Sequence, residues 1–511
     1  MAYDDNADKQ QITHSLKQFL THVHLYRCPR KDMLWSSRKA INAVVLLVIC
    51  TMLIISLILN ENDTESAHAN IISATYFEAA KNMPPNTMLI LLTSQKYLVG
   101  SRSLKCFSES DDEELVSDMS IKNAVPEIIE CKWTPYLAQC ATVSNVRSLQ
   151  IALAGDEQYF VQIPFRKSVE RLYDVVTCVT PLFLNERWQL LVLAVEVYRY
   201  YGVDMQNIYV TSMVSAVYDL LKIYEERGWI NIDPWPKMDF EHDLNYDPNK
   251  ELEWRSQVAA QTDCLLKYKE SARFIIFGDL DDILFPRLGT SYLSEFEALL
   301  EKEKSAAAFI YDRYESQLLF ARQPTFYSIR RALQSVAISE EWLDGKWVAI
   351  PSRVITAAIH YPWIVSSPYV AIAVPNDTNF IAHFRTWTFS AVQVEETEGR
   401  KLWSLVDEKD INAIEESFRE TVSSNVDLFN ELPHAEVYYG LIEKCYNKIF
   451  YSVGKKSRVC PTHFHCTVPE LRGFNCTIIR GRFEERRLAN KFYIHYSYNW
   501  YIEQSDHGCT I

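Results

Sequence analysis

Three aspartates stand within four consecutive positions of this 511-residue chain: Asp279, Asp281 and Asp282. They directly follow the apolar run RFIIF at residues 273–277. Neighbouring carboxylates repel one another, so a buried group of them needs protons or a cation. Mn²⁺ and Mg²⁺ favour carboxylate ligands and usually share their site with substrate phosphates. Asp279 and Asp281 are therefore the expected ligands of a divalent cation that acts on a diphosphate leaving group.

Two other interpretations of this acidic run are open on these residues alone. Acidic side chains also favour the N-terminal end of a helix, where they interact with its dipole. A strand followed by Asp-x-Asp-x-Thr is typical of phosphohydrolases of the haloacid dehalogenase type. Asp282 and Ile283 depart from the residues expected at the last two positions of that motif. That motif also usually opens its domain, whereas several strand and helix patterns precede it here.

The residues before the acidic run predict alternating strands and helices. Apolar β-branched runs indicate strands, and apolar residues at helical spacing indicate helices. The expected strands are 173–180, 207–211, 229–232 and 273–277, and the expected helices are 185–201, 214–227 and 251–268. This order predicts an α/β fold with a mostly parallel sheet between helices. Ligands of such sheets bind at the carboxyl ends of the strands, which is where the aspartates lie.

An uncharged apolar segment spans residues 41–59 (INAVVLLVICTMLIISLIL). As a helix it would extend roughly 28 Å, close to the hydrocarbon thickness of a bilayer. Arg38 and Lys39 precede it, and Glu61 and Asp63 follow it, so the positive-inside rule places the N-terminus in the cytosol. We expect a single-pass type II signal-anchor rather than a cleaved signal peptide or a buried core helix. The expected location is the membrane of the Golgi or another secretory compartment.

The cysteines and glycosylation sequons agree with a lumenal domain. Ten of the twelve cysteines follow the apolar segment, which favours disulfide bonds. Asn62, Asn376 and Asn475 each begin an N-glycosylation sequon. The spacing CPTHFHC at residues 460–466 also resembles a zinc site, but disulfides are the favoured interpretation in this compartment.

The expected organisation has six parts. They are a cytosolic tail (1–40), the anchor (41–59), a stem (60–70), a β-rich accessory region (71–168), the catalytic domain (169–395) and a helical, Cys-rich extension (396–511). The net charge of −14 argues against a nucleic-acid partner, because phosphate binding needs clustered positive charge. Tryptophans such as Trp229, Trp235, Trp342 and Trp347 are candidates for stacking on sugar rings, although such residues more often belong to a core.

Residues 173–385 resemble glycosyltransferase family 92, whose members transfer β-galactosyl groups onto animal glycans. The matching stretches are CVTPLF at 178–183, YEERGWINIDPW at 224–235, the helix around Asp263, FGDLDD at 277–282, HYP at 360–362 and HFR at 383–385. Asp282 stands where the family has Glu, and Phe384 where Tyr is usual. The resemblance implies a GT-A-type fold, a UDP-sugar donor, Mn²⁺ (or Mg²⁺), an inverting reaction and a glycan or glycoprotein acceptor.

The resemblance also suggests roles for particular residues. Asp279 and Asp281 would hold the metal, and His360 is the candidate third ligand, with a hydrogen-bonded core histidine as the alternative. The candidates for donor or acceptor binding are Pro181, Asp282, Lys346, His383 and Arg385. Inversion needs a carboxylate to deprotonate the acceptor, and Glu341 and Asp344 are the candidates, with a solvated acidic turn as the alternative.

Two further questions are left open by the sequence. A lumenal glycan-binding protein that keeps the same scaffold without turnover is an alternative to the enzyme. The stem and the β-rich region are candidates for forming a homodimer.

Overall fold

The computed structural model describes residues 66–96, 102–240, 244–389, 400–401, 406–451 and 458–510. Ser66–Ile511 forms one compact unit. The expected tail, anchor and most of the stem, together with Asn62, lie outside the described residues. Within the described part of the chain, none of the helices has the length and apolarity needed to cross a bilayer.

The central sheet begins with four parallel strands in the order β13-β11-β10-β14. Every strand and helix expected between residues 173 and 278 is confirmed within a few residues at its ends, except that the third helix begins later. The elements are β10 (Tyr173–Leu182), α3 (Trp188–Tyr200), β11 (Met205–Val210), α4 (Ser215–Glu226), β13 (Ile230–Pro234), α5 (Gln257–Tyr268) and β14 (Ala272–Gly278). Before α5, Trp254 and Ser256 adopt positive φ angles of 41° and 58°, which interrupt a helix that the sequence pattern starts at residue 251.

The prediction of a mostly parallel sheet is wrong for the rest of the sheet, which is mixed. β17 is antiparallel to both β14 and β16, and β15 is antiparallel to β21, while β16 is parallel to β21 and β20. The connection between β16 and β17 contains the helices η3 and α7 and is long enough to allow either strand direction, so the direction depends on which strands pair. The elements are β15 (Asp282–Leu284), α6 (Tyr292–Lys302), β16 (Ala306–Phe320), η3 (Pro324–Phe326), α7 (Ile329–Ser335), β17 (Ala337–Ala349), β20 (Val370–Ala373), β21 (Ile381–Phe389) and β22 (Arg400–Lys401).

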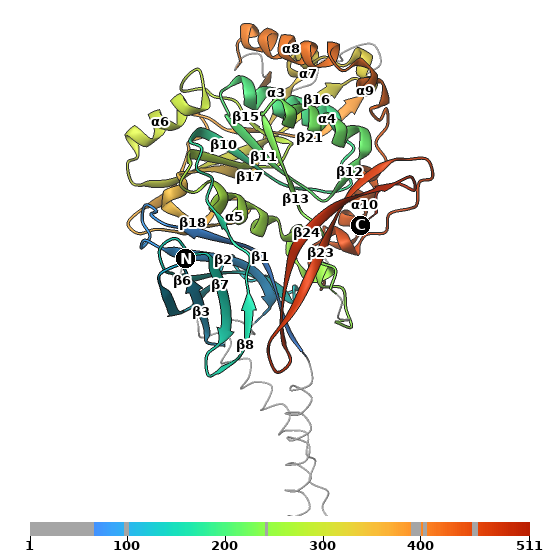
Figure 1. The fold of residues 1–511 in the computed structure, drawn as a ribbon. Coiled ribbons are helices and arrows are strands. Elements are labelled where there is room, and N and C mark those ends of the chain that lie inside the picture. The colour runs from blue at the N-terminus through green and yellow to red at the C-terminus, as the bar shows by residue number, and fades with distance from the viewer. Residues whose placement is uncertain are drawn as a thin grey trace, which may run out of the picture. The chain divides into compact units, whose positions relative to one another are not determined.

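Both faces of the parallel strands are covered. Val175 and Val179 of β10 belong to a core with α3 and α4, whereas Val176 and Cys178 face the core that α5 helps to form. This alternation follows from the two-residue period of a strand and explains why β10 reads as a continuous apolar run. In Figure 1, α3, α4 and α7 lie on one side of the sheet and α5 on the other. The Cys178–Cys264 disulfide joins β10 to α5.

A second sheet contains strands from both ends of the described chain, in the order β12-β23-β24-β1-β2-β6-β5. The C-terminal hairpin of β23 and β24 pairs with β1, and these strands run beside one another in Figure 1. α5 packs between the two sheets, because Val258 and Leu266 share a core with Leu89 and Leu91 of β2. The strands are β1 (Ala67–Phe77), β2 (Thr87–Gln95), β5 (Ser120–Asn123), β6 (Trp133–Ala141), β9 (Arg166–Lys167), β12 (Ser212–Val214), β23 (Cys476–Ala489) and β24 (Phe492–Ser505).

The remaining elements complete the unit. Two small sheets contain β3 (Leu104–Glu109), β4 (Glu114–Asp118), β7 (Ser148–Leu153) and β8 (Asp156–Gln162), and β18 (Val354–Ala357) and β19 (Pro362–Val365). The other helices are η1 (Pro248–Glu251), η2 (Glu253–Ser256), η4 (Pro351–Arg353), α8 (Glu408–Ser423), α9 (Val426–Glu431), α10 (Tyr438–Ile449) and η6 (His463–His465).

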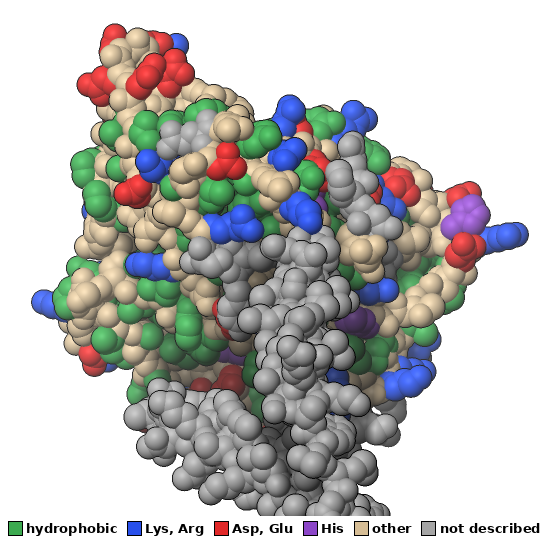
Figure 2. Space-filling view, turned by 90° about the horizontal axis from the view of Figure 1, so that it is seen from below, with side chains coloured by type: hydrophobic (Ala, Val, Ile, Leu, Met, Phe, Trp, Pro, Cys, Tyr) green, Lys and Arg blue, Asp and Glu red, His purple; other side chains and the backbone are tan. Residues whose placement is uncertain are grey.

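The ten cysteines after the apolar segment form five disulfides, as expected. The pairs are Cys106–Cys140, Cys131–Cys460, Cys178–Cys264, Cys445–Cys466 and Cys476–Cys509. Cys460 and Cys466 are bonded to different partners, so neither thiol is available for the zinc site that their spacing resembles. On the face seen in Figure 2, the described Lys and Arg side chains are scattered among acidic and apolar ones.

Candidate active site

The acidic run forms the turn between β14 and β15. The backbone N–H of Asp282 donates to the carbonyl of Asp279 at 3.1 Å, which closes the turn directly after the buried strand. β15 then pairs with β21 so that Asp282 lies opposite His383. The N–H of Phe384 also donates to the carbonyl of Asp281 at 2.7 Å. The pairing of these two strands therefore brings His383 to the aspartates.

Asp281, Asp282 and His383 offer ligand atoms that all lie within 4.8 Å of one another. His383 Nε2 is 3.5 Å from Asp281 Oδ2, and His383 Nδ1 is 3.0 Å from Glu315 Oε1. Burial acts to lower the pKa of His383, but its contact with Asp281 and the nearby negative charges raise that pKa to about 9. Burial acts to raise the pKa of Asp281, and the same contact with His383 outweighs it, so that pKa is lowered.

Asp282 is a buried carboxylate without a hydrogen bond. It is 1% exposed, and neither oxygen of its side chain has a hydrogen-bond partner among the described residues. Two cations stand slightly farther away, with Arg313 at 3.7 Å and Lys346 at 3.8 Å. Burial raises the pKa of Asp282 to about 6. Burying a carboxylate without hydrogen bonds costs free energy, and a bound cation would offset that cost.

Asp279 is held by other groups. Its Oδ2 accepts a hydrogen bond from the buried Lys346 ammonium at 2.8 Å. Its Oδ1 accepts from Gln257 Nε2 at 3.1 Å and from the hydroxyl of Thr180. The carboxylate of Asp279 is therefore fixed beside Lys346, next to the group formed by Asp281, Asp282 and His383.

His360 does not join that group of three. Its Nδ1 lies 2.8 Å from the carbonyl oxygen of Gly345, and burial is the main cause of its lowered pKa. Gly345 precedes Lys346 on β17 and packs against Tyr311 of β16. A Cβ atom at Gly345 would lie 1.5 Å from the Tyr311 carbonyl oxygen, so only glycine fits this close approach.

The other predicted residues lie at different places. Glu341 and Asp344 are exposed on β17, which also carries Lys346. Pro181 lies at the end of β10 and lines a cavity of about 350 Å³ beside Asp279, Asp281 and His383. Helix α10 contributes Tyr438, Tyr439, Ile442, Glu443 and Tyr446 to the lining of this cavity. The side chain of Arg385 lies outside what the structure describes.

Sequence reasoning missed four residues at the site. Thr180 and Gln257 hold Asp279, Arg313 approaches Asp282, and Glu315 holds the imidazole of His383. One signal for the last two was present. Arg313 and Glu315 are two positions apart on β16, so they project to the same face of an otherwise mostly apolar strand.

Two of the predicted glycosylation asparagines lie in the described chain. Asn376 is partly exposed in the turn between β20 and β21. Asn475 is exposed and precedes Cys476, which is bonded to Cys509. Neither position is buried, and their modification stays a prediction.

Comparison with known proteins identifies relatives over most of the chain. The family model described as glycosyltransferase family 92 matches residues 173–422. Two Caenorhabditis elegans proteins described as members of that family are 32% and 28% identical to this chain, over 86% of it and 88% and 90% of their own lengths. A solved UDP-glucose pyrophosphorylase structure is 9% identical and covers 49% of this chain and 99% of its own, but its TM-score of 0.18 supports no argument.

Proposed function

Because the chain belongs to glycosyltransferase family 92 and is a glycosyltransferase, we propose that it moves a sugar from a UDP-sugar to a glycan acceptor with the help of a divalent cation. Asp281, Asp282 and His383 hold this cation in the proposal. The single observation that carries the metal site is Asp282, whose buried carboxylate has no hydrogen-bond partner among the described residues. The family assignment leaves the phosphohydrolase alternative without support.

The donor set fits the proposed cation. Two carboxylates and one imidazole converge within 4.8 Å, and Mn²⁺ accepts both kinds of ligand. A bound Mn²⁺ or Mg²⁺ would act as a Lewis acid toward the diphosphate of the donor. His383, rather than His360, is the proposed third protein ligand, because only His383 stands with the two aspartates. Glu315 orients the His383 ring through Nδ1, as a second carboxylate commonly does for a ligating histidine.

Other residues of the site provide positive charge and position. Lys346 and Arg313 approach the aspartates from neighbouring strands, and both are placed to balance the charge of a donor diphosphate. Thr180 and Gln257 fix the carboxylate of Asp279, which in turn holds the Lys346 ammonium. Pro181 and the tyrosines of α10 wall the adjoining cavity, which is where we place the donor.

Several finer features are proposals drawn from the family resemblance. We propose galactose as the sugar, inversion at its anomeric carbon and a GT-A-type scaffold for the central sheet. Glu341 and Asp344 remain the proposed bases for the acceptor hydroxyl, since their exposed positions on β17 leave them open to an acceptor. The six-part organisation, a type II anchor at residues 41–59 and a Golgi lumen location are proposed on the sequence alone.

A transfer assay tests the proposal. The full-length chain, solubilised in detergent, is incubated with Mn²⁺, a panel of UDP-sugars and N-glycan acceptors. We expect UDP release coupled to a lengthened glycan, lost in EDTA and in Asp281→Ala. Full transfer by Asp281→Ala would contradict the metal site. A chain that binds UDP-sugar and glycan without turnover would support the glycan-binding alternative.

A further inference from the structure

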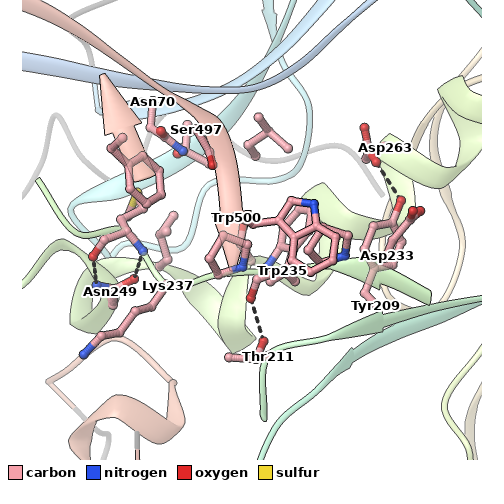
Figure 3. A pocket seen from close by; sticks show the side chains of 18 of the residues that line it. Asn70, Tyr209, Thr211, Asp233, Trp235, Lys237, Asn249, Asp263, Ser497 and Trp500 are labelled. Carbon is pink, nitrogen blue, oxygen red and sulfur yellow. Dashed lines mark hydrogen bonds between the residues drawn. The ribbon is translucent and has the colours of Figure 1, made fainter. Parts of the chain in front are cut away.

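A second cavity, of about 290 Å³, lies between the two large sheets. Its walls come from β1 and β2, from the C-terminal hairpin of β23 and β24, and from the carboxyl ends of β11 and β13. Figure 3 shows it from close by, with Trp235 and Trp500 drawn between Asn70 at one end and Asp233 and Asp263 at the other. Its volume is at the lower end of the range for pockets that bind small molecules.

Three buried polar atoms on the wall of this cavity have no hydrogen-bond partner among the described residues. They are Asn70 Oδ1, Thr93 Oγ1 and Ser256 Oγ. The three residues are 7%, 1% and 6% exposed, so bulk water does not readily satisfy them. Buried polar atoms without partners are uncommon in native proteins, and three around one cavity indicate a ligand that both donates and accepts hydrogen bonds.

Aromatic rings line the same cavity. Trp500 is 45% exposed, although a large apolar ring of this kind is usually covered. A β-bulge in β24 places an extra residue between Ser497 and Asn499 where the register with β23 shifts. Because the bulge changes which side chains share a face, both Ser497 and Trp500 line the cavity. Gly481 lets β23 approach closely, since a Cβ there would lie 3.0 Å from Pro236 Cγ.

Most of the charges around this cavity are paired with one another. Arg166 is bonded to Asp263 at 2.6 Å, and Asp233 is bonded to Lys267 at 2.8 Å. Arg166 and Lys267 thus neutralise both aspartates of the wall, and Lys237 is the single further cation among the lining residues. A diphosphate, which needs several positive charges, would find only this one cation here. A neutral polyhydroxyl ligand fits better, because its hydroxyl groups satisfy the polar atoms and its C–H faces pack on the indole rings.

We propose that this cavity binds a neutral sugar of the glycan acceptor, away from the position that receives the transferred sugar. This inference rests on the proposed transferase function. This cavity is a neighbour of the cavity beside Asp279, Asp281 and His383. Phe183 lines that cavity and His463 lines this one, and the centroids of their rings are 4.0 Å apart. Ser256 and Gln257 likewise line one cavity each. The two cavities therefore share part of a wall, and a sugar bound in this one would lie close to the proposed position of the donor.

Glycan binding is measured by calorimetry in EDTA, with the full-length chain in detergent and a panel of a biantennary N-glycan, lactose and methyl β-galactoside. Trp500→Ala should weaken binding of the N-glycan at least tenfold. Tyr498→Ala is the matched control, because Tyr498 is 57% exposed on the same strand but does not line the cavity. The affinity of this variant for the N-glycan should equal that of the wild type.

Thr93→Val is the second variant. It removes the unpartnered hydroxyl at nearly constant volume, so it should weaken glycan binding several-fold without lowering the melting temperature. If Thr93 had only a structural role, Thr93→Val would lower both the glycan affinity and the melting temperature.

Three results would overturn the proposal. They are no binding of any panel sugar by the wild type, equal affinity in Trp500→Ala, and weaker UDP binding in Trp500→Ala, which would make this the nucleoside cavity. Because the measurement needs neither metal nor turnover, a failed transfer assay leaves its outcome unaffected.

Discussion

The ammonium group of Lys346 lies 2.8 Å from a carboxylate oxygen of Asp279, which it reaches from the neighbouring antiparallel strand. The same nitrogen is 3.8 Å from Asp282. Lys346 is 1% exposed, so its charge is screened little by water. This lysine therefore balances part of the negative charge of the acidic run in the chain without a metal, and it competes with any cation that binds there.

Lys346→Met tests this competition. The variant keeps most of the side-chain volume but leaves Asp282 with Arg313 as its nearest described cation. We expect a loss of roughly 2 kcal/mol in the free energy of unfolding in EDTA, below the range for fully buried pairs because Asp279 is partly exposed. Saturating Mn²⁺ should then raise the melting temperature more in the variant than in the wild type. Equal metal-induced shifts would contradict this role of Lys346.

His383→Ala and His360→Ala form a matched pair that locates the third metal ligand. His383 stands with Asp281 and Asp282, whereas His360 does not belong to that group of ligand atoms. We expect His383→Ala to lose the increase in melting temperature on adding Mn²⁺, and His360→Ala to keep it. The reverse result would restore His360 as the ligand and would show that His383 has a structural role.

Glu315→Gln examines a positioning residue. The carboxylate of Glu315 lies 3.0 Å from Nδ1 of His383 and fixes the ring so that Nε2 faces Asp281. Replacing such a partner typically costs 10-fold or more in metal affinity. We expect about that loss in Mn²⁺ affinity by calorimetry, with an unchanged melting temperature in EDTA. Asp312→Asn, which removes a charge from the same strand, is the control and should leave the affinity unchanged.

The parts of the fold that the sequence predicted could be predicted for one physical reason. The elements from β10 to β14 follow one another along the chain, and each has its own apolar period, so their order and type can be recognised locally. The position of the aspartates after β14 follows from that order. The mixed part of the sheet was not predicted, because strand direction beyond β14 depends on which distant strands pair.

The dependence on distant strand pairing also explains why the sequence alone could not distinguish His383 from His360. His360 and His383 both stand in motifs that resemble the family, and nothing local distinguishes them as ligands. The pairing of β15 with β21 makes the difference, because it sets His383 opposite Asp282. Likewise, β1 pairs with β24 from the opposite end of the described chain, and the sequence around either strand does not indicate this pairing. The second cavity depends on that pairing, so the sequence indicated Trp235 as a candidate for stacking without indicating where it would stack.

Gly345→Ala tests the close contact between β16 and β17. A Cβ atom would lie 1.5 Å from the carbonyl oxygen of Tyr311, so the strands must separate and Lys346 must move. We expect a loss of about 3 kcal/mol in the free energy of unfolding, at the upper end for overpacking. Gly440→Ala in α10 is the control, because nothing lies within 4 Å of its Cβ position. It should stabilise the chain by about 0.5–1 kcal/mol, since alanine favours helix more than glycine.

Lys269 gives the chain a pH-dependent stability away from the active site. It is 2% exposed and donates to the carbonyls of Pro351 and Val354, and burial lowers its pKa to about 8. Between that value and roughly 10.4, the ordinary lysine pKa, the unfolded chain binds more protons than the folded chain. The contribution of Lys269 to stability therefore rises with pH across this window and is constant on either side of it.

The comparison of wild type with Lys269→Met isolates this contribution. Between pH 7.5 and pH 10.5, the wild type should gain about 3 kcal/mol relative to the variant, measured as the difference in free energy of unfolding by denaturant titration at each pH. Other titrating groups change both proteins alike and cancel in this difference. A constant difference across the range would mean that the folded protein accommodates the Lys269 charge as well as water does. A difference that changes in the opposite direction would mean that the buried ammonium is stabilised by the two carbonyls beyond its hydration.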